Sequence, residues 1–518
     1  MRPTFMGFET AKSAIFTNQK SIDIVGNNLA NTDTNGYTRQ RVERTSISPS
    51  VYTTKVSSSR VGLIGQGVDT LGVSQTRDAF LDKCFRDEYA KTSYHAQATD
   101  ILSDIQSALG DGSDVTDEGG LYSAISKIFE SINDFVQNPT MDTEANLVMS
   151  AFKNMTQVIN QLDAKLTTVA DRQKDDLSIN INRVNDVAEQ IAHLNKVISE
   201  DVTVLTTDNE YFRPNELMDE RNLLLDELSQ YGEITIESVP NGAVNVSMGG
   251  HKMVDGNNFN TLGMNENADD TVSLVWRSTG ENLVTKNGSL MASFSYINGR
   301  GRNVTSSNET TEQGILYYRD RLDTFANTFA KLVNSTVPVL DTATNKPMID
   351  SATGSTVYKQ LIGEKSEATG KTNSKVPATA GGISISDEWT QSGAGYFIYS
   401  RTENVEEYAQ KIASYLTEEK VNFQSTGESF SGTFADYEVD FIGKLGADLA
   451  FQSGRQEATA LVSDDFMAKR DEVAGVSQDE ETADMLKYQR SYEAAARIMT
   501  VLDDLLDVLI NRMGRVGL

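Results

Sequence analysis

Apolar residues recur at alternating steps of three and four at both ends of the chain, and this repeat predicts helices that pair with other helices. Near the N-terminus the repeat runs through Phe8, Ala11, Ile15, Ile22, Val25 and Leu29, with Asn18 at its one polar position. Near the C-terminus it runs unbroken through Met485, Tyr488, Tyr492, Ala495, Met499, Leu502, Leu506, Leu509 and Met513. We therefore expect a heptad-repeat helix at each end of the chain, joined in a coiled coil.

The C-terminal helix has a start signal in the sequence. Ser477 and Glu480 are spaced as a capping box, and Asp479 and Glu481 add negative charge where the helix dipole favours it. The helix is predicted to begin near Ser477. We interpret these acidic residues as helix-capping groups and not as catalytic acids or bases.

Each apolar stripe is narrow, and the opposite face of each helix is charged, so neither helix can be buried on all sides. Two hypotheses remain open: the ends pair within one folded chain, or they also pack on neighbouring copies and become ordered on assembly. On the second hypothesis the candidate assembly residues lie on the two stripes and in the turn after the first helix. They are Ile15, Ile22, Val25, Leu29, Asn31, Gly36, Tyr37, Met485, Tyr488, Tyr492, Ala495, Met499, Leu502, Leu506 and Leu509.

The segment after the first helix reads ANTDTNGYTRQ, and its Asn35-Gly36 pair predicts a tight turn. The segment also resembles a calcium loop, but Val42 stands where a bidentate Glu is needed, so we reject a calcium site. Residues 37–60 carry five basic side chains against Glu43 and read as an extended arm. A solvated arm and an arm docked on an acidic neighbour are equally compatible with this pattern.

Composition excludes several classes of function. Acidic residues outnumber basic ones by 74 to 46, a net charge of -28, which disfavours binding to nucleic acid or to anionic membranes. One cysteine and three scattered histidines argue against a disulfide, a metal site or a cofactor site. No apolar run reaches the length of a membrane span, and no cleavable signal peptide is recognisable at the N-terminus.

The length of 518 residues is enough for about three or four domains. Helical periodicity over residues 147–198 and in shorter segments predicts a helical-bundle domain of residues 76–232, 303–339 and 437–473. Runs of alternating apolar and polar residues, separated by hairpin dipeptides, predict an antiparallel β domain at 233–302. The last of these runs is LMASFSYI. Residues 340–436, with pieces such as GISIS and YFIYS, are expected to form a second irregular or β-rich insert.

The predicted fold class is therefore α+β and multidomain. Residues 1–75 and 474–518 form the terminal coiled coil, the helical domain follows, and the β-rich inserts are outer lobes. No nucleophile, metal-protease or phosphate-loop motif is found, and Tyr488 and Tyr492 are interpreted as packing residues. We expect no enzyme activity and no catalytic, cofactor-binding or metal-binding residues.

Two motifs resemble those of the axial-protein family of the bacterial flagellum, which includes rod, hook and hook-associated proteins. They are ANTDTNGYTRQ after the first helix and GVSQDEETADMLKYQRSYEAAARIM at the start of the last. Within this family, GYTRQ, GVSQDEE and NELMDERNLLLDELSQYGEITIE resemble the hook-associated proteins of the hook–filament junction. The resemblance covers the first 75 residues, much of the helical part and everything after about residue 437.

The resemblance implies a structural adaptor that joins hook to filament. It implies a ring or layer of own copies, with hook protein below and the second hook–filament junction protein above. It also implies export through the flagellar type III apparatus to the cell exterior, with a cytoplasmic chaperone on the C-terminal helix. The alternatives are a hook or distal-rod subunit, a secreted adhesin or enzyme on a flagellar scaffold, and an intracellular coiled-coil oligomer.

Overall fold

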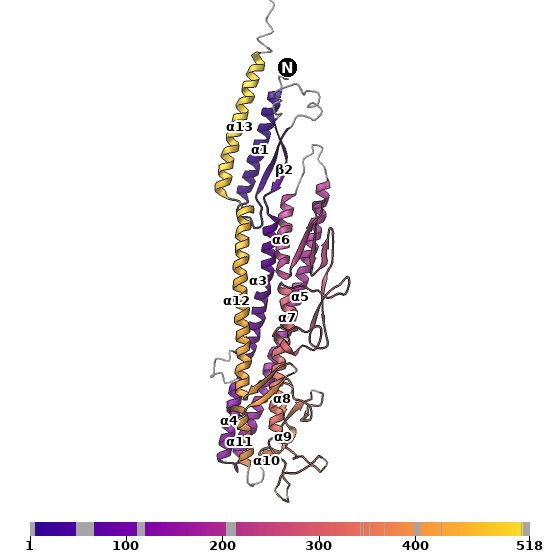
Figure 1. Cartoon of the computed structure of the whole chain (residues 1–518), viewed down its shortest axis with the longest axis vertical. Coiled ribbons are helices and arrows are strands. Elements are labelled where there is room, and N and C mark those ends of the chain that lie inside the picture. Colours follow the sequence, from indigo (N-terminus) through magenta and orange to yellow (C-terminus); the bar gives the residue numbers. More distant parts are fainter. Residues whose placement is uncertain are drawn as a thin grey trace, which may run out of the picture.

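The structure, a computed structural model, describes residues 6–47, 67–110, 120–203, 214–397 and 405–510, except 342, 345, 352, 367, 426 and 509. These residues form a long, narrow molecule (Figure 1). A pair of helices lies at one end, a helical body follows, a β lobe flanks the body, and small helices and strands gather at the far end. The α+β multidomain fold class is confirmed.

The helical body contains the long helices that periodicity predicted and one short helix that it did not predict. They are α3 (Ala79–Leu109), α4 (Leu121–Gln137), α5 (Asp142–Thr203), α6 (Asn215–Tyr231), α7 (Ser289–Ile297), α8 (Ile315–Asn334) and α12 (Phe434–Ala474). Helix α5 has 62 residues and is about 93 Å long at 1.5 Å per residue. It therefore spans most of the body, and the other helices and the β lobe pack along it.

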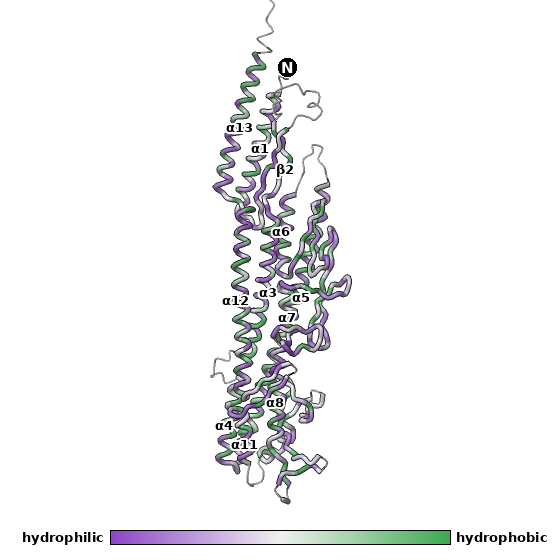
Figure 2. Tube along the Cα trace, in the orientation of Figure 1, coloured by the Kyte–Doolittle hydropathy of each residue, from purple (hydrophilic) through white to green (hydrophobic). Residues whose placement is uncertain are grey.

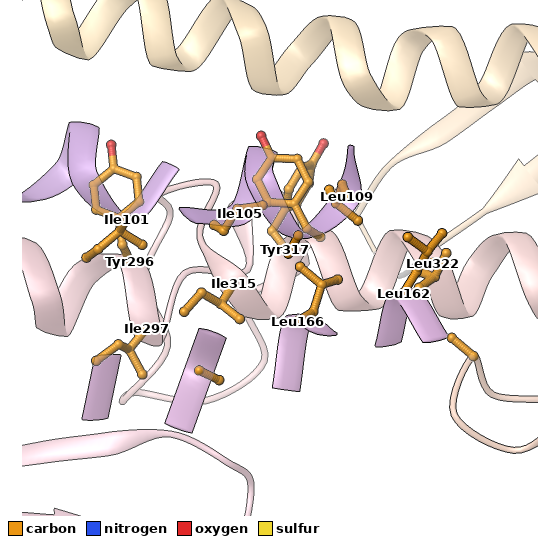
Figure 3. Close-up of a cluster of buried hydrophobic side chains, with 14 of the residues drawn as sticks. Ile101, Ile105, Leu109, Leu162, Leu166, Tyr296, Ile297, Ile315, Tyr317 and Leu322 are labelled. Carbon is orange, nitrogen blue, oxygen red and sulfur yellow. The ribbon is translucent and has the colours of Figure 1, made fainter. Parts of the chain in front are cut away.

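The core of the body is an apolar layer between helices that are far apart in sequence. Figure 3 shows Ile101, Ile105 and Leu109 of α3 beside Leu162 and Leu166 of α5, and Ile315, Tyr317 and Leu322 of α8. All of these side chains are buried. Burial of these large apolar side chains away from water stabilises the packing of the long helices.

The β lobe consists of two small antiparallel sheets. The first has the order β3-β4-β5-β6, and the second pairs β7 with β8. The strands are β3 (Ile234–Ser238), β4 (Val244–Met248), β5 (His251–Asp255), β6 (Asn258–Phe259), β7 (Leu262–Glu266) and β8 (Val272–Trp276). The hairpin dipeptides of this region are Asn241-Gly242, Gly249-Gly250 and Asn287-Gly288. The first two are confirmed as turns, because their glycines have positive φ between paired strands. The hairpin expected at Asn287-Gly288 is wrong, because Gly288 is the N-cap of helix α7.

Two asparagines of α5 attach the β lobe to the body. Asn195 Nδ2 donates to Val244 O at 2.8 Å, and its Oδ1 accepts from Val244 N at 3.0 Å. Asn185 makes the same pair of bonds with Leu262 of β7, at 3.0 and 2.8 Å. These side chains satisfy strand-edge backbone groups that would otherwise lack partners.

One predicted strand of the β domain is wrong. The run LMASFSYI forms helix α7, and most of its residues are buried. A short segment that is buried on nearly all sides loses its helical periodicity, so its apolar run resembles a strand. A helix therefore lies within residues 233–302, where an antiparallel β domain was predicted.

The insert at 340–436 contains both strands and helices. Strands β9 (Ile362–Lys365), β10 (Thr372–Asn373) and β11 (Ile383–Ile385) form one sheet, and β12 (Val421–Gln424) pairs with β13 (Ser429–Gly432). The helices are α9 (Asp387–Ser392), α10 (Ala394–Phe397) and α11 (Val405–Thr417). The strand expected in GISIS is confirmed as β11. The strand expected in YFIYS is wrong for Tyr396 and Phe397, which lie in α10, and residues 398–400 lie outside the described residues.

Buried carboxyls make the stability of the body depend on pH. Burial raises the pKa of a group of carboxyls, namely Asp100, Asp219, Asp320, Asp323, Glu438 and Asp448. A carboxyl with a higher pKa in the folded state binds a proton more readily there, so acidification from pH 7 towards the ordinary value near ~4 favours folding. The described carboxyls whose pKa is lowered are the smaller group of Asp269, Glu309 and Asp341.

We therefore expect a higher Tm at pH 5.5 than at pH 7.5, measured by circular dichroism. Relief of the charge repulsion from a net -28 acts in the same direction. Repeating the measurement in 0.5 M NaCl screens that long-range repulsion, so the difference that remains reports on the buried carboxyls. A Tm that falls steadily from pH 7.5 to 5.5 in both salts would contradict the prediction.

Candidate assembly interface

Helices α1 (Met6–Ala30) and α13 (Gln478–Asp507) pack against each other beyond the end of the body (Figure 1). A Cβ on Gly7 would lie 3.3 Å from Leu502 Cδ1, while Asn28 at the other end of α1 bonds Glu481. The two helices are therefore antiparallel. The pairing of the two ends within one chain, the first of the two hypotheses, is seen in the structure.

The stripe residues are covered to different degrees by this pairing. Val25 and Ala495 are buried, and Leu29 and Tyr492 are exposed. The half-buried residues are Ile15, Ile22, Met485, Tyr488, Met499, Leu502 and Leu506, and Leu509 lies outside the described residues. A single partner helix thus covers the predicted stripes only in part, and the role of these residues in assembly remains a prediction.

The contact face of α1 is more polar than its repeat indicated. The buried residues of α1 include Thr17, Asn18, Ser21 and Asn28 beside Ala11 and Val25. Ser21 Oγ donates to Thr17 O at 2.7 Å, so this hydroxyl is satisfied within the helix. These small polar side chains bury little apolar surface, so the packing of α1 on α13, β1 and β2 gains limited hydrophobic stabilisation.

Helix α13 carries a second apolar stripe that the repeat analysis missed. Ile498, Val501, Leu505 and Val508 are exposed, with 54, 57, 58 and 42% of their surface accessible. Each precedes a predicted stripe position by one residue, so together they widen the apolar face of the helix. Figure 2 shows hydrophobic residues recurring along the length of α13. We name these four residues the outer stripe.

The turn after α1 is held by side chains of its own segment. Asn31 Nδ2 donates to Asn27 O at 2.9 Å, and Tyr37 OH donates to Asn28 Oδ1 at 2.9 Å. Gly36 has a φ of 78°, and a Cβ there would lie 2.5 Å from Leu223 of α6. Glycine is therefore required both for the backbone conformation and for the contact with the body. Asn31, Gly36 and Tyr37, all half-buried, position the turn against the body.

Burial and nearby negative charge act on the phenol of Tyr37. Burial, followed by the carboxylates of Glu216, Asp219 and Glu481, raises its pKa to about 12. Tyr37 therefore stays protonated at neutral pH and can donate its hydrogen bond to Asn28.

The acidic residues at the start of α13 pair with the arm that follows the turn. Ser477 Oγ accepts from Glu480 N, as predicted, but the Glu480 carboxylate accepts from Arg39 Nη1 at 2.8 Å. Glu481 is 1% exposed and accepts from Arg39 Nε at 2.6 Å and from Asn28 Nδ2 at 3.0 Å. Glu480 and Glu481 lie in the first turn of α13, as predicted, but both carboxylates also pair with a residue more than 440 positions away, which the sequence analysis did not predict.

The basic arm docks on the helix pair of its own chain over its described part. Strand β1 (Gln40–Ser46) pairs antiparallel with β2 (Val68–Gln75). The Arg44 guanidinium lies 4.6 Å from the centroid of the Tyr488 ring, and Arg44 also donates to Ser21 Oγ. Residues 48–66 of the arm lie outside the described residues. Of the two alternatives left open by the sequence, docking on acidic side chains is seen for Arg39, within the same chain, whereas Arg44 contacts Tyr488 and Ser21.

Within the described residues, no group of three or more His, Cys, Asp or Glu side chains could hold a metal ion. In the same part of the chain, no helix has the length and apolarity needed to cross a membrane.

The chain matches three descriptions of flagellar families. Residues 102–337 match the helical domain of the flagellar hook-associated protein FlgK. Residues 8–38 match the flagella basal body rod protein family, and residues 467–513 match the C-terminal region of the flagellar basal body rod FlgEFG proteins. The two rod-protein matches include most of α1 and α13. The helical-domain match runs from within α3 past the end of α8 and includes the β lobe.

Relatives that match over the whole chain agree with these family matches. Flagellar hook-associated protein 1 of Bacillus subtilis is 29% identical over 551 residues, covering 100% of both chains. The protein of that name from Salmonella typhimurium is 22% identical and covers 97% of this chain and 98% of its own. The solved flagellar hook junction protein FlgK of Burkholderia pseudomallei has a TM-score of 0.54 at 12% identity, covering 74% of this chain and 99% of that one. This last likeness is one of fold alone.

The paired terminal helices and the family matches make the chain similar to the axial proteins of the bacterial flagellum. Within that class it resembles flagellar hook-associated protein 1, and the resemblance that its motifs predicted is confirmed.

Proposed function

We propose that the protein is a structural adaptor subunit of the bacterial flagellum that joins the hook to the filament. Its relatives over the whole chain carry the name hook-associated protein 1, and a solved protein of similar fold is a hook junction protein. The helical-domain match at 102–337 favours this role over that of a hook or distal-rod subunit, because it is a hook-associated description.

The observation that carries the proposal is the uncovered apolar surface of α13. Contact with α1 leaves the outer stripe exposed to solvent. Full burial of one such side chain contributes roughly 1.5–3 kcal/mol of stabilising free energy. A helix with two adjacent apolar stripes fits between two partner helices, one from its own chain and one from a neighbour. The proposed assembly site therefore comprises both predicted stripes and the outer stripe.

The proposed partners are further copies of the chain in a ring or helical layer, hook protein on one side and the second hook–filament junction protein on the other. In this proposal the protein is exported through the flagellar type III apparatus and acts outside the cell. A cytoplasmic chaperone covers the C-terminal helix before export, since an exposed apolar stripe is an association hazard. The role is structural, and the protein acts without catalysis, cofactor, nucleic acid or membrane.

Deleting the gene tests the proposal directly. We expect cells that carry hooks without filaments and that release flagellin into the medium, seen by electron microscopy and by immunoblotting of the supernatant. Normal filaments in the deletion strain would contradict the proposal. Cells without hooks would point to the alternative role in the rod or hook.

A further inference from the structure

Charged and polar side chains from four separate segments meet where the helix pair joins the body. They lie after the first turn, before and within the start of α3, on α6 and at the end of α12. We name this group the neck clasp, and its members are Thr38, Arg77, Asp82, Asp219, Asp226 and Arg470.

The first part of the neck clasp holds the chain between the turn and β1. Thr38 N and Thr38 Oγ1 donate to the two carboxylate oxygens of Asp219 at 3.1 and 2.6 Å. Arg77 donates to Thr38 Oγ1 at 3.3 Å, and its Nη1 lies 3.9 Å from Asp219 Oδ1. Thr38 and Asp219 are both buried. Helix α6 of the body thus directly binds the segment that connects α1 to β1.

The second part of the neck clasp is a series of alternating basic and acidic side chains that crosses the body. Arg77 Nε and Nη2 donate to Asp82 at 2.6 and 3.0 Å. Arg470 Nη1 lies 4.0 Å from Asp82 Oδ1 and donates to Asp226 Oδ2 at 2.7 Å. Arg86 Nε donates to the other oxygen of Asp226 at 2.6 Å. The alternation therefore connects α3, α6 and α12 through paired charges.

The helix pair makes most of its other packing contacts with itself and the β1–β2 ribbon. Helix α1 packs extensively on α13, β1 and β2. An apolar contact at the junction is that of Gly36 with Leu223, which is itself exposed. Apolar contacts are non-directional, whereas hydrogen-bonded ion pairs, and the bidentate Arg77–Asp82 pair above all, fix orientation as well as distance. Removing one member leaves a buried charge without its partner, which is costly.

We propose that the neck clasp fixes the angle between the helix pair and the body, so the isolated protein presents its outer stripe in one orientation. The clasp also gives a role to the motif NELMDERN, whose Asp219 binds Thr38 of the motif GYTRQ. This inference concerns the single chain, so it stands or falls independently of the proposed flagellar role.

Distance measurements between two spin labels in the full chain test the inference. The labels are placed at the exposed positions Ser453 of α12 and Arg497 of α13, each changed to Cys in a Cys84→Ser background. For the parent protein at pH 7.5, double electron–electron resonance is expected to give one narrow distance distribution. Asp219→Ala is expected to broaden that distribution at least twofold.

Two further variants keep the test decisive. Thr38→Val preserves side-chain volume, removes the hydroxyl bond and lies outside the body helices, so the body folds even if Asp219→Ala destabilises it. It is expected to broaden the distribution as well. Asp465→Ala removes an exposed carboxylate of α12 that pairs with Lys469, and it should leave the distribution unchanged. Parent-like widths in both clasp variants, or equal broadening in Asp465→Ala, would overturn the inference.

Discussion

Changing Val501 and Leu505 together to Asp is expected to abolish filament growth while the purified protein stays folded. Both side chains are more than half exposed in the single chain, so the substitution removes little from its own packing. In the proposed assembly the same positions are covered by a neighbouring helix. Two carboxylates would have to be buried there without partners at every subunit contact, which strongly disfavours assembly.

To test this prediction, the variant is expressed in a deletion strain and the filaments are counted by electron microscopy. Swimming motility is a second readout. Thr500→Asp is the matched control, because it adds one negative charge at an exposed polar position of the same helix turn. The control should restore filaments. Filaments of normal number in the double variant would show that the outer stripe is not an assembly surface.

Trp389→Ala is expected to lower the free energy of unfolding by about 3–5 kcal/mol, the usual cost of removing a large buried aromatic side chain. Trp389 belongs to the insert at 340–436 but is fully buried against the body. Its ring centroid lies 5.4 Å from that of Phe152 on α5 and 5.7 Å from that of Phe397. Losing this ring leaves a cavity between the insert and the longest helix of the body.

Denaturant unfolding followed by circular dichroism measures this loss. Tyr358→Ala removes an exposed aromatic ring of the same insert and should change stability much less. If the insert were an independent lobe, Trp389→Ala would leave the main helical transition unchanged. That outcome would contradict the packing of Trp389 as a shared core residue.

The parts of the fold that could be predicted are those governed by local periodicity. Helices of the body, the hairpin glycines and the start of α13 at Ser477 follow from spacing along the chain. The terminal repeats also predicted which helices would pair. They did not reveal the outer stripe, because they follow only one line of apolar residues along α13. Val501 and Leu505 each precede a residue of that line by one position and belong to the same broad face.

The parts that could not be predicted depend on residues far apart in the chain. The acidic residues in the first turn of α13 fit a helix start, and nothing local indicates that Glu481 is buried against Arg39 and Asn28. Helix α7 was predicted as a strand because it is buried on nearly all sides and so lacks an amphipathic spacing. Helix α10 has only four residues, too few to show a helical period. Tertiary context outweighs local preference in such short segments.

The junction between α12 and α13 determines how tension passes through the molecule. Only residues 475–477 separate the two helices, and a Cβ on Gly475 would lie 2.4 Å from Asp471 O, so the joint is short and closely packed. Tension applied at the free end of α13 would therefore be carried through α13 and then α12 to the opposite end of the molecule. The β3–β8 lobe lies beside these two helices and packs against α5, so it is not part of this path.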